Sequence, residues 1–289
     1  ERMLGVEVNP FFSPSDAAVK KVAERLGRGE TFRMTPLGVH FGEAGKTVED
    51  PYFGGVGPAR TGCTNCGECM TGCRHGAKNT LVKNYLYLAE QAGAQVVAET
   101  TVADIRELAQ GGFELSVRGS SAWRGSGQRS IRAGQVIVAA GALGTAKLLQ
   151  KVRAAGNLQG LSDRLGHLSR TNSESLLGVV ARGKDVDYSQ GAAITSSIFP
   201  SPDTHIEPVR YGKGSNFMAL LQSVIASGKA GQNPNVPRLL WATITNLHRL
   251  PKFYNLRDWS ERAIILLVMQ ARDNSLVTKL KGGLFGRRL

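Results

Sequence analysis

The four cysteines of the chain lie together in one short run and are its clearest chemical signal. They are Cys63, Cys66, Cys69 and Cys73, separated by two, two and three residues. A disulfide framework or a set of core thiols would scatter its cysteines along the chain. This spacing instead matches the run with which bacterial ferredoxins bind iron–sulfur clusters, with Arg74 in the place of the usual proline. The run therefore predicts four metal ligands.

Three interpretations of this run remain open from the residues alone. The first is a cluster of the 4Fe–4S type. In two-cluster ferredoxins the fourth cysteine binds the other cluster, so Cys73 must fold back here, or the fourth ligand must lie outside this sequence. The second is a zinc ion, with His75 as an extra ligand. The third is a compact loop of reduced thiols that holds no metal.

A second signal is a glycine turn that follows an apolar segment. Residues 136–140 predict a short buried strand, Gly141 and Gly144 follow, and a helix is expected over 145–155. Bare glycines let the main chain approach a bulky ligand, and a helix N-terminus favours negative charge. A plain turn into a helix would show the same pattern. The Gly-x-Gly-x-x-Gly motif of dinucleotide-binding domains is absent from the sequence.

The periodicity of apolar residues predicts the elements that position these groups. Ser13, with Asp16 three residues later, predicts a capped helix over 13–26. The first half of the chain is otherwise expected to be an α/β arrangement with a parallel component, and the second half a sheet-rich domain with a helical cover. The further expected elements are helices at 81–92 and 237–250, the latter stopped by Pro251, and strands at 95–102, 113–118, 129–133, 176–181, 192–199, 206–209, 263–271 and 276–281.

Composition excludes several classes of protein. With 289 residues, 42% of them hydrophobic, and no apolar run long enough for a membrane span, the sequence predicts a globular protein. The net charge is +13, but the cations are scattered, which argues against nucleic-acid binding. Basic residues gather only near the end, where they predict at most a contact with an anionic membrane surface. They are Lys279, Lys281, Arg287 and Arg288.

The chain begins without an initiator Met or a signal peptide. It is therefore expected to be an internal piece of a longer protein. Reduced cysteines and the missing signal favour a cytoplasmic or peripheral membrane location.

Three stretches, 73–86, 99–106 and 136–149, resemble the GMC (glucose–methanol–choline) flavoprotein oxidoreductases, and within them the bacterial cholesterol oxidase-like branch, some of whose members carry a cysteine-rich insert. The resemblance implies a fold of the α/β plus α+β class, with an incomplete Rossmann-like FAD-binding domain and a substrate domain on a mixed sheet. It divides the chain into an N-terminal segment, a cysteine-rich insert, a partial FAD-binding domain and a partial substrate-binding domain, at residues 1–62, 63–80, 81–172 and 173–289.

The same resemblance implies the residues that contact FAD. Val102 would contact its adenine part through the backbone, the stretch from Ala140 to Ala142 would line the adenosine–ribose side, and Asn172 lies in a stretch similar to one near the cofactor. The FAD phosphates would bind a glycine loop outside this sequence. The predicted cofactor-binding residues are Val102, Ala140, Gly141, Ala142, Gly144 and Asn172.

The activity implied is oxidation of an alcohol, including sterols, by hydride transfer to the flavin. The catalytic histidine and its companion are expected beyond Leu289, and none of the five histidines present is assigned that role. Electrons would pass to dioxygen, or through the iron–sulfur cluster to a redox carrier. The alternative is an iron–sulfur electron-transfer or metal-structured module without flavin.

Overall fold

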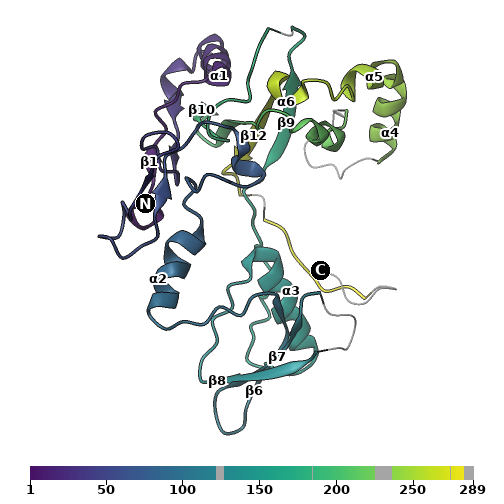
Figure 1. The fold of residues 1–289 in the computed structure, drawn as a ribbon. Coiled ribbons are helices and arrows are strands. Elements are labelled where there is room, and N and C mark those ends of the chain that lie inside the picture. The colour runs from purple at the N-terminus through teal and green to yellow at the C-terminus, as the bar shows by residue number, and fades with distance from the viewer. Residues whose placement is uncertain (122–126, 184, 225–235, 274, 283–289) are drawn as a thin grey trace. The chain divides into compact units, whose positions relative to one another are not determined.

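The computed structural model describes residues 1–121, 127–183, 185–224, 236–273 and 275–282. The chain divides into two compact units, Glu1–Gly93 with Glu174–Gln270, and Ala94–Ser173 with Ala271–Leu289 (Figure 1). The basic pair Arg287–Arg288, singled out in the sequence, lies outside the described residues.

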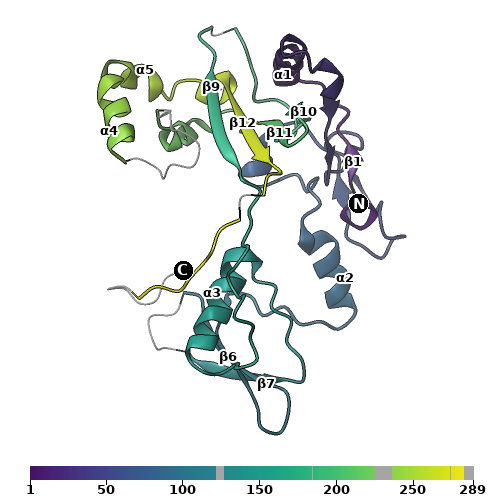
Figure 2. The ribbon, with the colours of Figure 1, turned by 180° about the vertical axis from the view of Figure 1, so that it is seen from behind.

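A five-stranded antiparallel sheet is the centre of the first unit. Strand β12, which is apolar along almost its whole length, pairs with β11 on one side and with β9 on the other. Figure 2 shows β9 and β12 side by side. In sheet order the strands are β2 (Arg33–Met34), β10 (Ser196–Ser201), β11 (Thr204–Val209), β12 (Ala263–Gln270) and β9 (Ser175–Val180).

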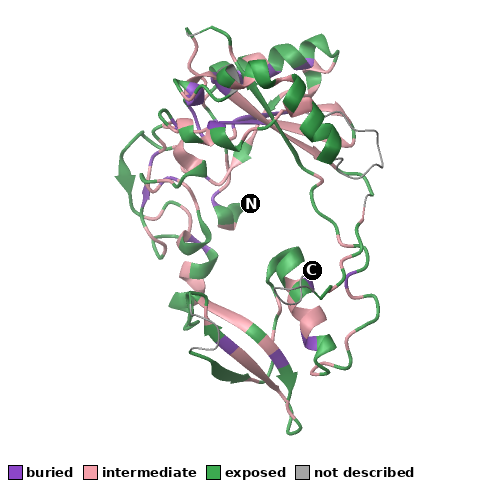
Figure 3. Ribbon diagram, turned by 90° about the vertical axis from the view of Figure 1, so that its right-hand side faces the viewer, coloured by how far each residue is buried: buried purple, intermediate pink, exposed green. Residues whose placement is uncertain are grey.

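Helix α1 (Pro14–Arg25) covers part of this sheet and confirms the predicted capped helix. The side chain of Ser13 accepts a hydrogen bond from the backbone N–H of Asp16, whose carboxylate accepts the backbone N–H of Ser13 in return. Val19 and Ala23 pack against Ile198 of β10 and form a buried cluster. This packing joins the start of the chain to residues far away in sequence. Figure 3 shows along the ribbon which parts of the chain are buried and which are exposed.

A group of short helices connects β11 to β12. Trp259 and Ala263 form a buried cluster with Ala219. The apolar helix expected over 237–250 is instead divided, and Pro251 lies in the first turn of a new helix rather than ending one. The helices are η5 (Asn216–Leu221), α4 (Val236–Thr245), η6 (Leu247–Arg249), α5 (Leu250–Phe253) and α6 (Trp259–Arg262).

The rest of the first unit is loops with short regular pieces, including the predicted loop at 51–62. The helix expected at 81–92 is divided at Asn84, whose side chain accepts the backbone N–H of Tyr85. The pieces are η1 (Arg2–Leu4), β1 (Glu7–Val8), η2 (Gly29–Thr31), β3 (Pro36–Leu37), β4 (Thr47–Val48), β5 (Arg60–Thr61), η3 (Glu68–Met70), η4 (Leu81–Lys83) and α2 (Tyr85–Gln91).

The second unit contains a three-stranded antiparallel sheet, β6 (Thr100–Glu107), β7 (Phe113–Gly119) and β8 (Arg129–Ala133), and the helix α3 (Gly141–Ala154). Helix α3 packs on β6. Ile105 and Val117 of the sheet are buried, as are Ala146 and Val152 of the helix. The mixture of helices and sheets in both units confirms the predicted mixed class of fold.

Several predicted strands are wrong. Residues 136–140 form no strand, and Ile137 is 92% exposed, because no described segment lies beside them to supply backbone partners. Strand β6 begins at Thr100 rather than at residue 95, and residues 276–281 form only a bridge from Leu276 to Ser169.

The predicted parallel component and mixed sheet are corrected as well. Every pair of named strands in the described parts of the chain is antiparallel. Residues 136–140 were to supply the parallel strand of the first half, and without a neighbour they form none. In the second half, β12 pairs antiparallel with β11 and also antiparallel with β9.

Candidate functional site

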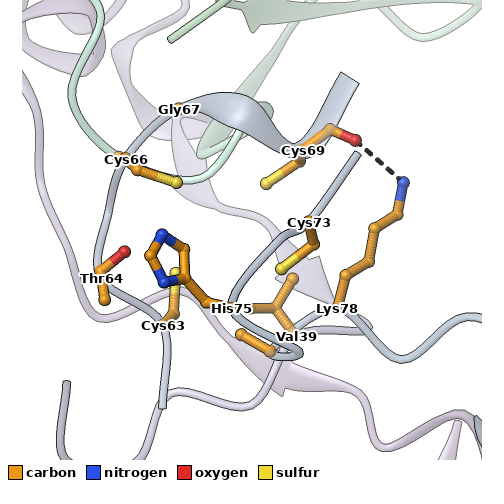
Figure 4. Close-up of a pocket in the computed structure, with 11 residues that line it drawn as sticks. Val39, Cys63, Thr64, Cys66, Gly67, Cys69, Cys73, His75 and Lys78 are labelled. Atoms are coloured by element: carbon orange, nitrogen blue, oxygen red, sulfur yellow. Dashed lines mark hydrogen bonds between the residues drawn. The ribbon is translucent and has the colours of Figure 1, made fainter. Parts of the chain in front are cut away.

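The four cysteines of the first unit line one pocket. Figure 4 shows their sulfur atoms turned toward a common space, with the ring of His75 beside them. All four are free thiols of intermediate burial. The other residues that line the pocket are Val39, Thr64, Gly67, Ala77, Lys78 and Gly191.

Glycines bend the chain so that Cys73 returns to the other three cysteines. Gly72 and Gly76, which flank it, have φ values of 117° and 84°, in the region that side chains rarely adopt. Gly67, between the second and third cysteines, has a φ of 73°. Cys73 thus folds back to line the same pocket as Cys63, while its role as a metal ligand stays a prediction.

Backbone amides point at three of the sulfurs. The N–H of Asn65 donates to Sγ of Cys63 at a donor–acceptor distance of 3.4 Å. The N–H of Ala193 donates to Cys69, which ties the loop to a segment far along the chain. Cys73 receives the most of these hydrogen bonds, from the four backbone N–H groups of residues 75–78. Such N–H···S bonds stabilise a thiolate more than a thiol.

The electrostatics of the pocket differ from one cysteine to the next. Burial raises the pKa of Cys63 and of Cys69 above the ordinary value for a thiol. Burial alone would also raise the pKa of Cys73, but its four backbone hydrogen bonds outweigh that effect and lower it. Among these three cysteines, Cys73 is the one whose pKa the protein backbone lowers.

Close backbone packing holds the cysteine loop against residues 189–212. Cys66 and Gly191 form a parallel bridge, in which the N–H of Gly191 donates to Asn65 at 2.8 Å. A Cβ atom on Gly67 would lie 2.1 Å from the carbonyl oxygen of Ser189, and one on Gly212 would lie 2.7 Å from that of Cys66. Side chains at these glycines would thus separate the two segments.

A buried ion pair lies next to this contact. Arg210, only 1% exposed, donates to the carbonyl of Gln190 and, at 2.5 Å, to the hydroxyl of Thr195. Its guanidinium lies 3.9 Å from the carboxylate of Asp16, which also accepts hydrogen bonds from Thr195 and Ser196. The positive charge of Arg210 interacts with Cys69, so a buried cation lies near the pocket. Nothing in the sequence pattern had pointed to Arg210.

Within the described residues, no group of three or more His, Cys, Asp or Glu side chains is arranged to hold a metal ion. The pocket brings the four predicted ligands together, and their role as metal ligands stays a prediction.

The glycine turn lies at the start of α3 in the second unit. The helix begins at Gly141, four residues earlier than expected, and its first residues are exposed. Gly141 has a φ of 71°, and a Cβ added there would meet nothing within 4 Å. The hydroxyl of Thr145 accepts the backbone N–H of Ala140 at 3.0 Å. The open backbone in front of α3 has the space and the N–H groups to receive an anionic ligand.

The other two residues predicted to contact FAD belong to the same unit. Val102 lies on β6, opposite Val117 of β7, and the strand pairing is irregular between Val102 and Asp104. Asn172 is exposed near the end of the segment 94–173. Helix α3 packs on the strand that carries Val102, while the roles of all these residues stay predictions.

The five histidines form no pair that resembles a catalytic centre among the described residues. His40 contacts the hydroxyl of Tyr52 at 3.2 Å, His205 stacks on Phe199, and His75 lines the cysteine pocket. The remaining two, His167 and His248, are exposed. In the described residues, none of the helices combines the length and the apolar character needed to cross a membrane.

Comparisons with known proteins agree with the resemblance of the three stretches. The chain is 52% identical over 298 aligned residues to a cholesterol oxidase of Mycobacterium tuberculosis, covering all of this chain and 52% of that protein. It is 45% identical over 294 residues to a cholesterol oxidase of Acinetobacter baumannii, covering 99% of this chain and 53% of that protein. The chain thus spans about half the length of the curated relatives it matches. The family model described as GMC oxidoreductase matches residues 55–163, a range that contains both the cysteine run and the glycine turn.

Proposed function

We propose that the protein carrying this chain is an FAD-dependent oxidoreductase that oxidises the hydroxyl group of an alcohol, with sterols as its substrate class. The observation that carries the proposal is the identity of 45–52% to cholesterol oxidases over almost the whole chain. At this identity we infer that the chain shares the fold of each relative over the half of that relative which it matches. The activity also depends on the half of the relatives that the chain does not span.

The glycine turn fits the adenosine end of FAD. Gly141, at the N-terminus of α3, exposes backbone without side-chain bulk, and an added Cβ there would meet nothing within 4 Å. We therefore keep Val102, the stretch Ala140–Ala142, Gly144 and Asn172 as the proposed FAD contacts. FAD, when bound, supplies the acceptor for the hydride that leaves the carbinol carbon.

The exposed apolar segment 136–140 supports the same proposal. Its side chains lack the packing partners that such a sequence needs, and Ile137 is almost fully exposed. We propose that this segment pairs as a strand of the FAD-binding domain with backbone that lies outside the described residues. The turn at Gly141 then directly follows the carboxyl end of a strand, which is where ligands bind in open α/β sheets.

The electron acceptor that we propose is dioxygen, since the matched relatives are named oxidases. The alternative acceptor is a redox carrier reached through an iron–sulfur cluster of the 4Fe–4S type at Cys63, Cys66, Cys69 and Cys73. Peripheral membrane contact and a cytoplasmic location are kept as predictions. The base that takes the hydroxyl proton is assigned to none of the histidines of this chain.

Substitution at Gly144 tests the FAD contact without backbone strain, which a change at Gly141 would add because of its positive φ. Gly144→Leu in the full-length protein places a side chain where the cofactor would lie. An overpacking cost of about 1–3 kcal/mol corresponds to roughly 5- to 150-fold weaker FAD binding. Gly134→Leu is the control at a position outside the proposed FAD contacts, where a Cβ meets nothing within 4 Å, whereas one on Gly144 would lie 3.3 Å from the Cβ of Ala140. Equal flavin retention by both variants would show that Gly144 does not face the cofactor.

A further inference from the structure

We propose that the outer edge of β9 (Ser175–Val180) binds a further β-strand of the same protein, supplied by the part of its length that this chain does not span. The inference concerns an interaction surface of the first unit and does not depend on the oxidoreductase activity. Three observations carry it: the composition of this edge, its contrast with the opposite edge of the same sheet, and the length of the matched relatives.

The outer edge of β9 is long and apolar. In the described parts of the chain β9 pairs only with β12, so its other side presents backbone N–H and C=O groups to which no described strand bonds. The strand contains no charged residue and no proline. Successive side chains of a strand point to opposite faces of the sheet, so β9 exposes apolar side chains on both faces. The exposed fractions are 68% for Leu176, 39% for Leu177, 58% for Val179 and 38% for Val180.

The opposite edge of the same sheet shows how a native edge is protected. That edge is β2, which is only two residues long and carries the exposed Arg33. Short strands and charged side chains are among the devices that keep an edge from pairing with a further strand. Strand β9 is six residues long and has neither device. A continuous apolar strand of this kind is typical of the interior of a sheet.

The matched relatives indicate where the further strand comes from. The chain covers 52% and 53% of the two cholesterol oxidases, so each of them has nearly as much sequence again outside the matched part. A strand on the same polypeptide reaches β9 at a high effective concentration and needs little contact area. A stable dimer needs about 20–30 residues from each partner, whereas β9 offers six. These sizes favour a strand of the same protein over a second copy.

Pairing at the outer edge changes the number of protected backbone amides. In an antiparallel strand, successive N–H groups point alternately to one side and to the other. Half of the six amides of β9 therefore bond to β12, and the other half point outward. A further strand would accept hydrogen bonds from the outward half. An open edge thus protects half of the amides, and a covered edge protects all of them.

Hydrogen exchange of the full-length protein, resolved to single amides, tests the proposal. We expect all six amides of β9 to exchange at least about a thousandfold more slowly than in an unfolded peptide. Strand β12 is the internal reference, because it has a strand on each side. If β12 is fully protected while half of the β9 amides exchange freely, the edge is open and the proposal is wrong.

A cross-link identifies the segment that covers the edge. A photoreactive phenylalanine replaces Leu176 in the full-length protein, and mass spectrometry identifies the peptide to which it couples. We expect a peptide that lies outside these 289 residues, in a product with the mass of a monomer. A partner peptide within these residues would assign the edge to the chain itself. A covalent dimer would assign it to a second copy, and either result would overturn the proposal.

A pair of matched variants tests the burial of the edge independently. Leu176→Lys places a charge in the covered edge and should raise the unfolded fraction by about tenfold or more. Leu26→Lys is the control, because Leu26 lies in the same unit and is 56% exposed; it should change that fraction by about twofold at most. Equally small effects would show that the edge of β9 stays in solvent. The FAD content of the same samples reports separately on the proposed oxidoreductase.

Discussion

The close contact between the cysteine loop, residues 63–73, and Ser189 gives a quantitative prediction for the stability of a Gly67 variant. In Gly67→Ala the new Cβ would lie 2.1 Å from the backbone oxygen of Ser189, closer than real Cβ atoms approach, at a residue whose φ is 73°. The left-handed conformation costs about 1–2 kcal/mol for a residue with a side chain. Overpacking against backbone adds about 1–3 kcal/mol. The free energy of unfolding should therefore fall by about 2–5 kcal/mol.

Gly27→Ala separates these two contributions. Gly27 has a similar φ of 66°, lies in the same unit, and has nothing within 4 Å of an added Cβ. Its substitution should cost only the conformational part, about 1–2 kcal/mol. Urea unfolding of both variants measures the difference, and the rate at which a thiol reagent modifies the native cysteines reports on the loop itself. Equal losses of stability, with equal thiol reactivity, would refute the proposed close contact between the loop and Ser189.

Two other substitutions test the buried charges and the acid dependence. Arg210→Ala leaves the carboxylate of Asp16 buried without its cation, so it should lower the free energy of unfolding in urea by about 3–5 kcal/mol. The control Arg153→Ala breaks an exposed ion pair with Asp163 and should lower it by less than about 1 kcal/mol. Similar losses for the two variants would contradict the burial of the Arg210–Asp16 pair. Burial alone would raise the pKa of Asp50, but four backbone N–H groups of the following loop lower it below its ordinary value of 3.8. Its stabilisation is therefore present above pH 3.8 and is lost as the pH falls through the lowered pKa. Asp50→Asn should therefore be less stable than the parent at neutral pH and should lose less stability than the parent on acidification. Unfolding measured as a function of pH tests this, and an acid dependence equal to that of the parent would contradict it.

Sequence reasoning succeeded where local chemistry determines structure. The capping residues of α1 and its apolar spacing are close together in the chain, and the helix forms as predicted. The alternating strand Phe113–Gly119 and its partner Arg129–Ala133 were placed correctly for the same reason, because a hairpin pairs neighbouring residues.

The prediction failed where structure depends on partners distant in the sequence or absent from the described residues. Residues 136–140 have the composition of a buried strand but have no neighbour with which to pair. The early start of α3 follows from Gly141, whose positive φ lets the chain turn directly into the helix. A glycine directly after an apolar segment was visible, but the sequence did not show which φ it would adopt.

The cysteine pocket shows both the success and the failure of reasoning from the sequence. Its four cysteines were singled out from their spacing alone, whereas Gly191, Ala193 and the buried cation of Arg210 come from elsewhere in the chain. The glycines at 67, 72 and 76, at nearly regular intervals through the run, were the signal that could have predicted that Cys73 folds back.

The identity of the bound flavin tests the proposed oxidoreductase most directly. The full-length protein is purified, denatured, and its released chromophore is identified, while the native protein is mixed with cholesterol in the absence of oxygen. The proposal predicts FAD in the released fraction and bleaching of the flavin absorbance by the sterol. A protein that releases no FAD, or whose flavin is not reduced by any sterol or simple alcohol, would contradict it.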